Sequence, residues 1–147
     1  MSQLLTSQFS GLFFARSADN WLANIKKRNI AQQLLSRKIR YLEHTFSAAG
    51  YLCLHQNSFL VLLNPDMSYR EKCLTLGHEI GHTFHCDLRG FSPQFLLQEE
   101  DDANFWNNVI EPFCEAFGEK WLSINGVAKF VDFSRGESKK FYNWSLS

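Results

Sequence analysis

The chain has 147 residues, of which 45% are hydrophobic and 20% charged, and its formal net charge is +0. This length and composition are typical of one globular domain with its own hydrophobic core. The balanced charge argues against a general nucleic-acid-binding domain, which is normally basic, so no direct nucleic-acid binding is expected. No apolar run approaches the length of a transmembrane helix. We therefore expect a single cytoplasmic domain over residues 1–147, without membrane association, whose ends at 1–18 and 134–147 are loosely ordered.

A helical pattern begins the ordered part of the chain, at about residues 19–48. Leu35, Ile39, Leu42 and Phe46 follow the spacing i, i+4, i+7 and i+11, which is typical of the buried face of a helix. The sequence therefore predicts one long N-terminal helix. The basic residues in this region point in different directions, which favours a solvated face over a binding patch.

Two short strands are expected next. Residues 51–55 and Ser58–Leu63 are rich in aromatic and branched side chains, and Gln56 and Asn57 between them are typical of a tight hairpin turn. The second run is almost wholly apolar, as expected for a strand that is covered on both faces.

A helix is predicted over residues 68–85. Ser68 and Glu71 have the S-x-x-E spacing of a capping box, and the segment contains no proline. Gly77 and Gly81 lie four residues apart, so they form a flat strip that another helix or a substrate can approach closely.

The same segment carries the pattern HExxH, in which His78 and His82 lie four residues apart. On a helix such residues share one face, so both imidazoles can bind one metal ion. Glu79 leaves the helix about 100° round from His78, beside the metal, where a base can take a proton from metal-bound water. The motif predicts a zinc hydrolase with Glu79 as its catalytic base.

A catalytic zinc site needs a third protein ligand and an open position for water. A further helix over about 112–122, ending at Asn125 and Gly126, places Glu111 and Glu115 on one face, four apart. One could bind the metal while the other holds a histidine from behind. The other candidates downstream are Glu99, Glu100, Asp101, Asp102, Glu119 and the thiol of Cys86.

Two blocks of this sequence resemble the ImmA/IrrE family of metallopeptidases, which are cytoplasmic gluzincin-like enzymes. The first block runs through Val61-Leu62-Leu63-Asn64-Pro65 to Leu74-Thr75-Leu76-Gly77-His78-Glu79-Ile80-Gly81-His82, and the second is Glu111-Pro112-Phe113-Cys114-Glu115-Ala116. The resemblance covers roughly residues 51–123 and implies a zincin-like minimal metallopeptidase.

The resemblance makes Glu111 the third metal ligand and Glu115 a support for a metal-binding histidine. It implies a zinc-dependent peptidase, with another divalent ion such as Mn²⁺ as an alternative. The implied substrate is a specific protein or peptide, with transcriptional regulators or repressors among the candidates. An oxyanion donor is also required, and His85 or Tyr69 could serve.

The sequence departs from the family in the second block. Pro112 directly follows Glu111 and disfavours α conformation there, which puts Glu111 at a helix start or a kink. Ser123 and Ile124 stand where the family usually has Met-Pro. These departures keep open a second hypothesis, a catalytically impaired metal-binding module that sequesters a partner protein.

The expected fold class is α+β. A small sheet with a hairpin packs against the HExxH helix, the Glu111 helix and the long N-terminal helix. A helix starting at Ser92-Pro93 and a last strand over 127–133 complete the expected elements.

Overall fold

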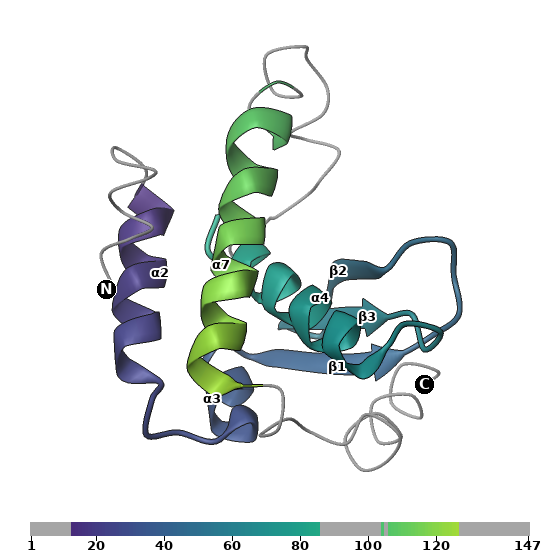
Figure 1. Cartoon of the computed structure of the whole chain (residues 1–147), viewed down its shortest axis with the longest axis horizontal. Helices are drawn as coiled ribbons and strands as arrows, with labels where there is room; N and C mark the ends of the chain where they lie inside the picture. Colours follow the sequence, from purple (N-terminus) through teal and green to yellow (C-terminus); the bar gives the residue numbers. More distant parts are fainter. Residues whose placement is uncertain (1–12, 86–103, 105, 127–147) are drawn as a thin grey trace.

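The structure is a computed structural model that describes residues 13–85, 104 and 106–126. In this part of the chain the fold is α+β, as expected from the sequence (Figure 1). The helix expected from Ser92-Pro93, the acidic run at 99–102, Cys86 and the strand expected over 127–133 lie outside the described residues. The elements in chain order are α2 (Phe13–Asn24), α3 (Ile30–Ser36), β1 (Ile39–Glu43), β2 (Gly50–His55), β3 (Ser58–Leu63), α4 (Tyr69–His82), the π-helical turn η1 (Trp106–Ile110) and α7 (Glu111–Asn125). No helix within these ranges is long and apolar enough to cross a membrane.

The three strands form one mixed sheet in the order β1-β3-β2. β3 is the central strand and pairs antiparallel with β2 and parallel with β1. Gln56 and Asn57 both have positive φ, at 51° and 63°, as a two-residue hairpin turn requires. The predicted hairpin and its turn are therefore confirmed, and the apolar run of β3 is explained by its central place.

The prediction of one helix over residues 19–48 is wrong. Asn29 starts a separate helix, α3, with a capping box that it forms with Gln32. Lys38 has a φ of 57°, which ends the helical path, and the next residues form β1. Leu35, which had counted toward the apolar face, is 77% exposed. Pairing with β3 therefore outweighs the local helical spacing.

The N-terminal boundary also needs correction. Residues 13–18, expected to be loosely ordered, are part of α2, and Ala15 and Ala18 are fully buried. Figure 1 shows α2 beside α7, while α4 lies between α7 and the sheet. The described core is thus built where α2, α4 and α7 meet and where α4 covers the sheet.

Glycines allow α4 and α7 to approach closely. A Cβ atom on Gly77 would lie 2.8 Å from Cε3 of Trp121 and 3.0 Å from Cα of Gly118. A Cβ on Gly118 would lie 2.9 Å from the backbone nitrogen of His78. The flat strip predicted on α4 is therefore covered by a helix, and this contact sets the spacing between His78 and α7.

A buried polar group fixes the far end of α7. The side chain of Gln33 is fully buried, and its Oε1 accepts a hydrogen bond of 2.8 Å from Trp121 Nε1. Its Nε2 donates to Asn125 Oδ1 over 2.7 Å. Gly126, with a φ of 74°, ends the helix at the predicted place. Because buried polar groups need their partners, this arrangement ties α3 to α7 in one orientation.

Candidate metal centre

α4 carries two histidines of the site and begins as predicted. The Ser68 side chain accepts a hydrogen bond from the backbone nitrogen of Glu71, and the Glu71 carboxylate accepts one from the backbone nitrogen of Ser68. The helix ends at His82, so His78 and His82 occupy its last two turns. Their ring centroids lie 4.9 Å apart, as expected for residues on the same face.

α7 supplies the third side chain. The helix begins at Glu111, with Pro112 in its first turn, where the missing backbone N–H of proline is not needed. The proline therefore places Glu111 at the helix start, which is one of the two outcomes that the sequence allowed. The turn η1 leads directly into this position.

The donor atoms of three side chains from α4 and α7 converge. Glu111 Oε2 lies 2.9 Å from His78 Nε2, and Glu111 Oε1 lies 3.1 Å from His82 Nε2. The two Nε2 atoms lie 3.2 Å apart. A tetrahedral zinc ion with ligands at about 2.0–2.1 Å holds neighbouring donor atoms about 3.3 Å apart. The donor types and their spacing thus fit a zinc ion bound by His78, His82 and Glu111.

Glu79 lies beside these atoms. A carboxylate oxygen of Glu79 lies within 4.8 Å of a ring nitrogen of both His78 and His82, whereas Glu111 makes the short contacts to both rings. Glu79 is only 8% exposed, and burial raises the pKa of its carboxyl group against the opposing charges of the histidines. A carboxyl group with a raised pKa beside a metal site suits a general base.

Charge pairing stabilises the centre when no metal is bound. Burial disfavours the charged form of His78, but the hydrogen bond that His78 donates to Glu111 and the charges of the neighbouring carboxylates outweigh it and raise the pKa of His78. Burial likewise opposes the charge on Glu111, but its bonds to His78 and His82 hold the pKa of Glu111 well below its usual range. Each of these pKa shifts therefore favours the charged form of its group, as expected for an imidazole and a carboxylate held in contact.

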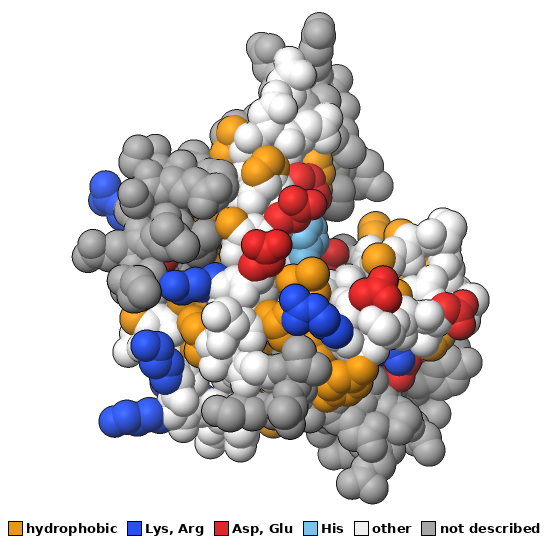
Figure 2. All heavy atoms as spheres, viewed as in Figure 1, with side chains coloured by type: hydrophobic (Ala, Val, Ile, Leu, Met, Phe, Trp, Pro, Cys, Tyr) orange, Lys and Arg blue, Asp and Glu red, His pale blue; other side chains and the backbone are white. Residues whose placement is uncertain are grey.

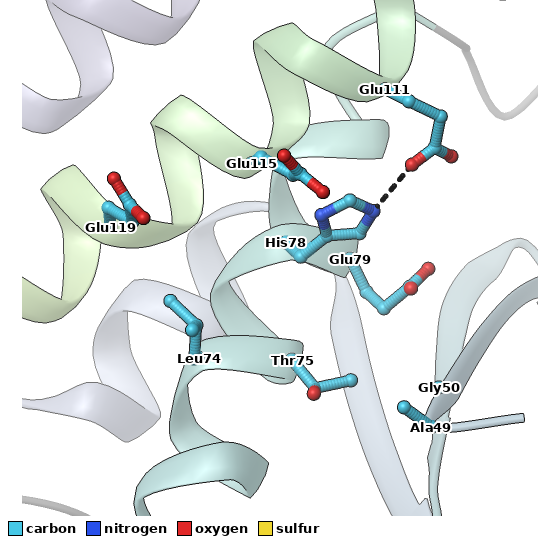
Figure 3. A pocket seen from close by; sticks show the side chains of 9 residues that line it. All are labelled: Ala49, Gly50, Leu74, Thr75, His78, Glu79, Glu111, Glu115 and Glu119. Atoms are coloured by element: carbon cyan, nitrogen blue, oxygen red, sulfur yellow. Dashed lines mark ion pairs between the residues drawn. The ribbon is translucent and has the colours of Figure 1, made fainter. Parts of the chain in front are cut away.

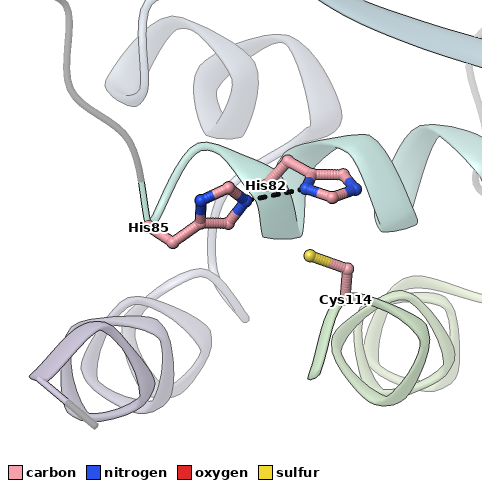
Figure 4. A group of neighbouring side chains, drawn as sticks. All are labelled: His82, His85 and Cys114. Atoms are coloured by element: carbon pink, nitrogen blue, oxygen red, sulfur yellow. Dashed lines mark hydrogen bonds between the residues drawn. The ribbon is translucent and has the colours of Figure 1, made fainter. Parts of the chain in front are cut away.

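His85 lies beside Nδ1 of His82 (Figure 4), whereas Glu111 lies at Nε2 of the same ring. His85 Nε2 lies 2.7 Å from His82 Nδ1. Burial lowers the pKa of His85 to about 3, so its ring is neutral and can accept a hydrogen bond from the Nδ1–H of His82. That bond fixes the tautomer in which His82 Nε2 is free to bind a metal.

His82, His85 and Cys114 form a second group with metal-binding side chains (Figure 4). None of the three lines the cleft described below, and Cys114 is fully buried. His82 could serve both groups only as a bridging imidazolate. The contact between the two rings is accounted for by a hydrogen bond, so we assign the metal centre to the group that contains Glu111.

The centre opens into a cleft of about 550 Å³ (Figure 3). Figure 2 shows acidic side chains gathered beside the histidine that reaches this face of the molecule. Of the side chains that the sequence assigned to the site, four line this cleft. The lining residues are Ala49, Gly50, Leu74, Thr75, His78, Glu79, Glu111, Glu115 and Glu119.

The remaining predicted site residues have different positions. Glu115 lies one turn beyond Glu111, and Figure 3 shows its carboxylate beside the His78 ring, where its charge raises the pKa of His78. Tyr69 lies at the start of α4 and does not line the cleft. Neither Tyr69 nor His85 is therefore placed to stabilise an oxyanion in the cleft.

Two residues at the centre were not expected from the sequence. The indole of Trp106 stacks on the His82 ring at a centroid distance of 5.2 Å and an interplanar angle of 16°. Phe14, from α2, meets the edge of the His85 ring at 6.0 Å. Both contacts depend on long-range packing, and no local spacing in the sequence indicates them.

Comparisons with models of known protein families, with curated proteins and with solved structures find no match to this chain.

Proposed function

We propose that this protein is a zinc-dependent peptidase with a zincin-like site. The observation that carries the proposal is the convergence of His78 Nε2, His82 Nε2 and the Glu111 carboxylate at spacings of 2.9–3.2 Å. The buried carboxylate of Glu79 beside them supplies the base that such a site needs. Another divalent ion such as Mn²⁺ is an alternative to zinc.

Each residue has a separate part in the proposed reaction. His78, His82 and Glu111 hold the ion, which when bound polarises the peptide carbonyl and lowers the pKa of water. Glu79 accepts a proton from the attacking water and delivers it to the leaving amine. His85 holds the His82 ring in position through the Nδ1 contact.

The proposed substrate is a protein or peptide. The cleft follows α7 from Glu111 to Glu119 (Figure 3), and such an elongated site suits an extended chain. The resemblance to the ImmA/IrrE family favours a cytoplasmic setting and a transcriptional regulator or repressor as the partner that is cut.

Metal content gives the first test. Protein freed of metal with a chelator, reloaded with zinc and dialysed is expected to retain one zinc ion per chain by elemental analysis. A double variant with His78→Ala and His82→Ala is the matched control and is expected to retain none. A ratio near zero for the reloaded wild-type protein would reject the site.

Cleavage gives the second test. Zinc-loaded protein is incubated with a proteome-derived peptide library, and new peptide ends are identified by mass spectrometry. Glu79→Gln keeps the size of the side chain but cannot accept the proton at neutral pH, so it is expected to keep zinc and lose cleavage. If neither form cuts any peptide or co-expressed regulator but both forms bind one, the alternative hypothesis of a module that sequesters a partner protein is favoured over the peptidase.

A further inference from the structure

One wall of the cleft is a row of carboxylates. Glu111, Glu115 and Glu119 lie four residues apart on α7, and all three line the cleft (Figure 3). Glu79 adds a fourth carboxylate from α4. Among the described residues that line the cleft, the only other ionisable group is His78, and the rest are the uncharged residues Ala49, Gly50, Leu74 and Thr75.

Two of these carboxylates keep an unbalanced negative charge when a metal ion is bound. The two charges of a divalent cation are balanced by Glu111 and Glu79, and the charges of Glu115 and Glu119 remain. Both side chains are exposed, and neither forms a hydrogen bond or ion pair with another residue in the described part of the chain. The wall therefore presents negative potential to whatever enters the cleft.

Glu79 is a second feature of the cleft that points to a ligand. Glu79 is more than nine-tenths buried and lies in the lining of the cleft, yet it makes no hydrogen bond to a described residue. Burying a carboxylate in this way is costly unless a ligand in the cleft satisfies it. The acidic row thus borders a site with a polar group that needs a partner, which distinguishes it from ordinary surface acids.

The spacing of the row matches an extended peptide. At 1.5 Å per residue along a helix, Glu115 and Glu119 lie about 6 and 12 Å from Glu111. Alternate side chains of an extended chain lie on one side and repeat every ~6.6 Å. In a peptide that runs along α7, side chains two and four residues away from the bond at the metal centre would therefore lie opposite Glu115 and Glu119.

From these observations we infer that the cleft selects an extended peptide segment with lysine or arginine two and four residues from the cleaved bond. Glu119 determines this specificity most directly, because it lies two turns away from Glu111 and touches none of the proposed metal ligands. The inference rests on the proposed peptidase function and names the substrate class of the same site.

Binding to a cleavage-deficient protein tests the inference directly. Zinc-loaded Glu79→Gln protein is titrated by fluorescence anisotropy into a ten-residue peptide of alternating alanine and lysine, and into its alanine–glutamine counterpart. The lysine peptide is expected to bind roughly 5- to 20-fold more tightly at low salt, since each exposed ion pair contributes about two- to five-fold. Added salt is expected to reduce the preference.

Variants in the same background assign the preference to the wall. Glu119→Gln is expected to reduce it about two- to five-fold, and Asp66→Asn, which removes an exposed charge outside the cleft, to leave it unchanged. Equal affinity for the two peptides would overturn the inference. A lysine preference that persists in the double variant Glu115→Gln/Glu119→Gln would also overturn it. The same holds if the protein binds a second zinc ion per chain that is lost in Glu119→Gln, because the row would then be a metal site.

The wild-type protein separates this inference from the proposed function. If the lysine preference is present but the zinc-loaded wild type cuts no peptide, the inferred preference for basic segments is supported and the proposed peptidase function is rejected. If the wild type cuts peptides that lack basic residues at both positions, the proposed peptidase function is supported and the inferred preference for basic segments is rejected.

Discussion

The His82 ring is held from behind by His85, whose Nε2 lies 2.7 Å from His82 Nδ1. If His82 Nε2 binds a metal ion, the proton of the neutral ring belongs on Nδ1, and His85 Nε2 lies within reach to accept it. Metal-binding histidines commonly donate their other N–H to a carboxylate or carbonyl, and here a second imidazole takes that place.

Loss of this acceptor is expected to weaken metal binding without removing a ligand. His85→Leu leaves the Nδ1–H of His82 buried without this partner, and we expect zinc affinity to fall about 10- to 100-fold. His85→Gln, whose amide oxygen can accept the bond, is expected to restore much of it. Competition with a zinc chelator measures both affinities, and His44→Leu controls for loss of an exposed histidine. Wild-type affinity in His85→Leu would show that the contact does not position His82.

Burial of His85 also predicts how the stability of the zinc-free protein depends on pH. In the unfolded chain His85 takes up a proton near pH 6.5, but in the folded protein its pKa is lowered to about 3. The unfolded state therefore binds more protons between these values, and this contribution to stability is lost as pH falls. Urea unfolding from pH 7 to 4 measures this contribution by comparing wild type with His85→Gln. The free energy of unfolding is expected to depend more steeply on pH in the wild type, by at most about 1.4 kcal/mol per pH unit. Parallel slopes would contradict the assignment.

Glu111 and Glu115 are expected to differ in their effects on metal affinity. Glu111 contacts both Nε2 atoms, whereas Glu115 affects the charge of His78 from beside its ring. Glu111→Ala is expected to abolish stable zinc binding, while Glu115→Ala costs at most about 10- to 100-fold. Isothermal titration with zinc compares the two. Unchanged affinity in Glu111→Ala would move the third ligand to another acid.

The parts of the fold that the sequence predicted correctly depend on local chemistry. The capping box of Ser68 and Glu71, the Gln56-Asn57 turn and the stop at Gly126 are each decided within a few residues. β1 was missed because its partner β3 lies about 20 residues further along the chain. Local spacing cannot reveal such a parallel pairing, and it gave a helix instead.

The candidate site shows the same division. The HExxH spacing by itself places His78, Glu79 and His82, whereas Glu111 required the pattern of a second block. His85 was named as a possible oxyanion donor at the end of a helix that was expected to run to residue 85. α4 ends at His82, and the following turn folds His85 behind that ring. Tyr69 is nine residues from His78, about 13 Å along the helix, which is too far to reach the centre.

The last prediction concerns the close contact that joins the two halves of the centre. A Cβ on Gly118 would lie 2.9 Å from the backbone nitrogen of His78 and 3.2 Å from the carbonyl oxygen of Leu74. Neither backbone atom can move without shifting α4. Gly118→Ala gains about 1 kcal/mol of helix propensity but incurs about 1–3 kcal/mol of overpacking, so we expect net destabilisation in urea unfolding. Zinc affinity is expected to fall as well, because the shift separates His78 from Glu111.

Ser123→Ala, at an exposed position of α7, is the matched control and is expected to stabilise the protein slightly through helix propensity alone. If Gly118→Ala stabilises the protein as Ser123→Ala does and binds zinc normally, the helices are not held at this distance by the glycine.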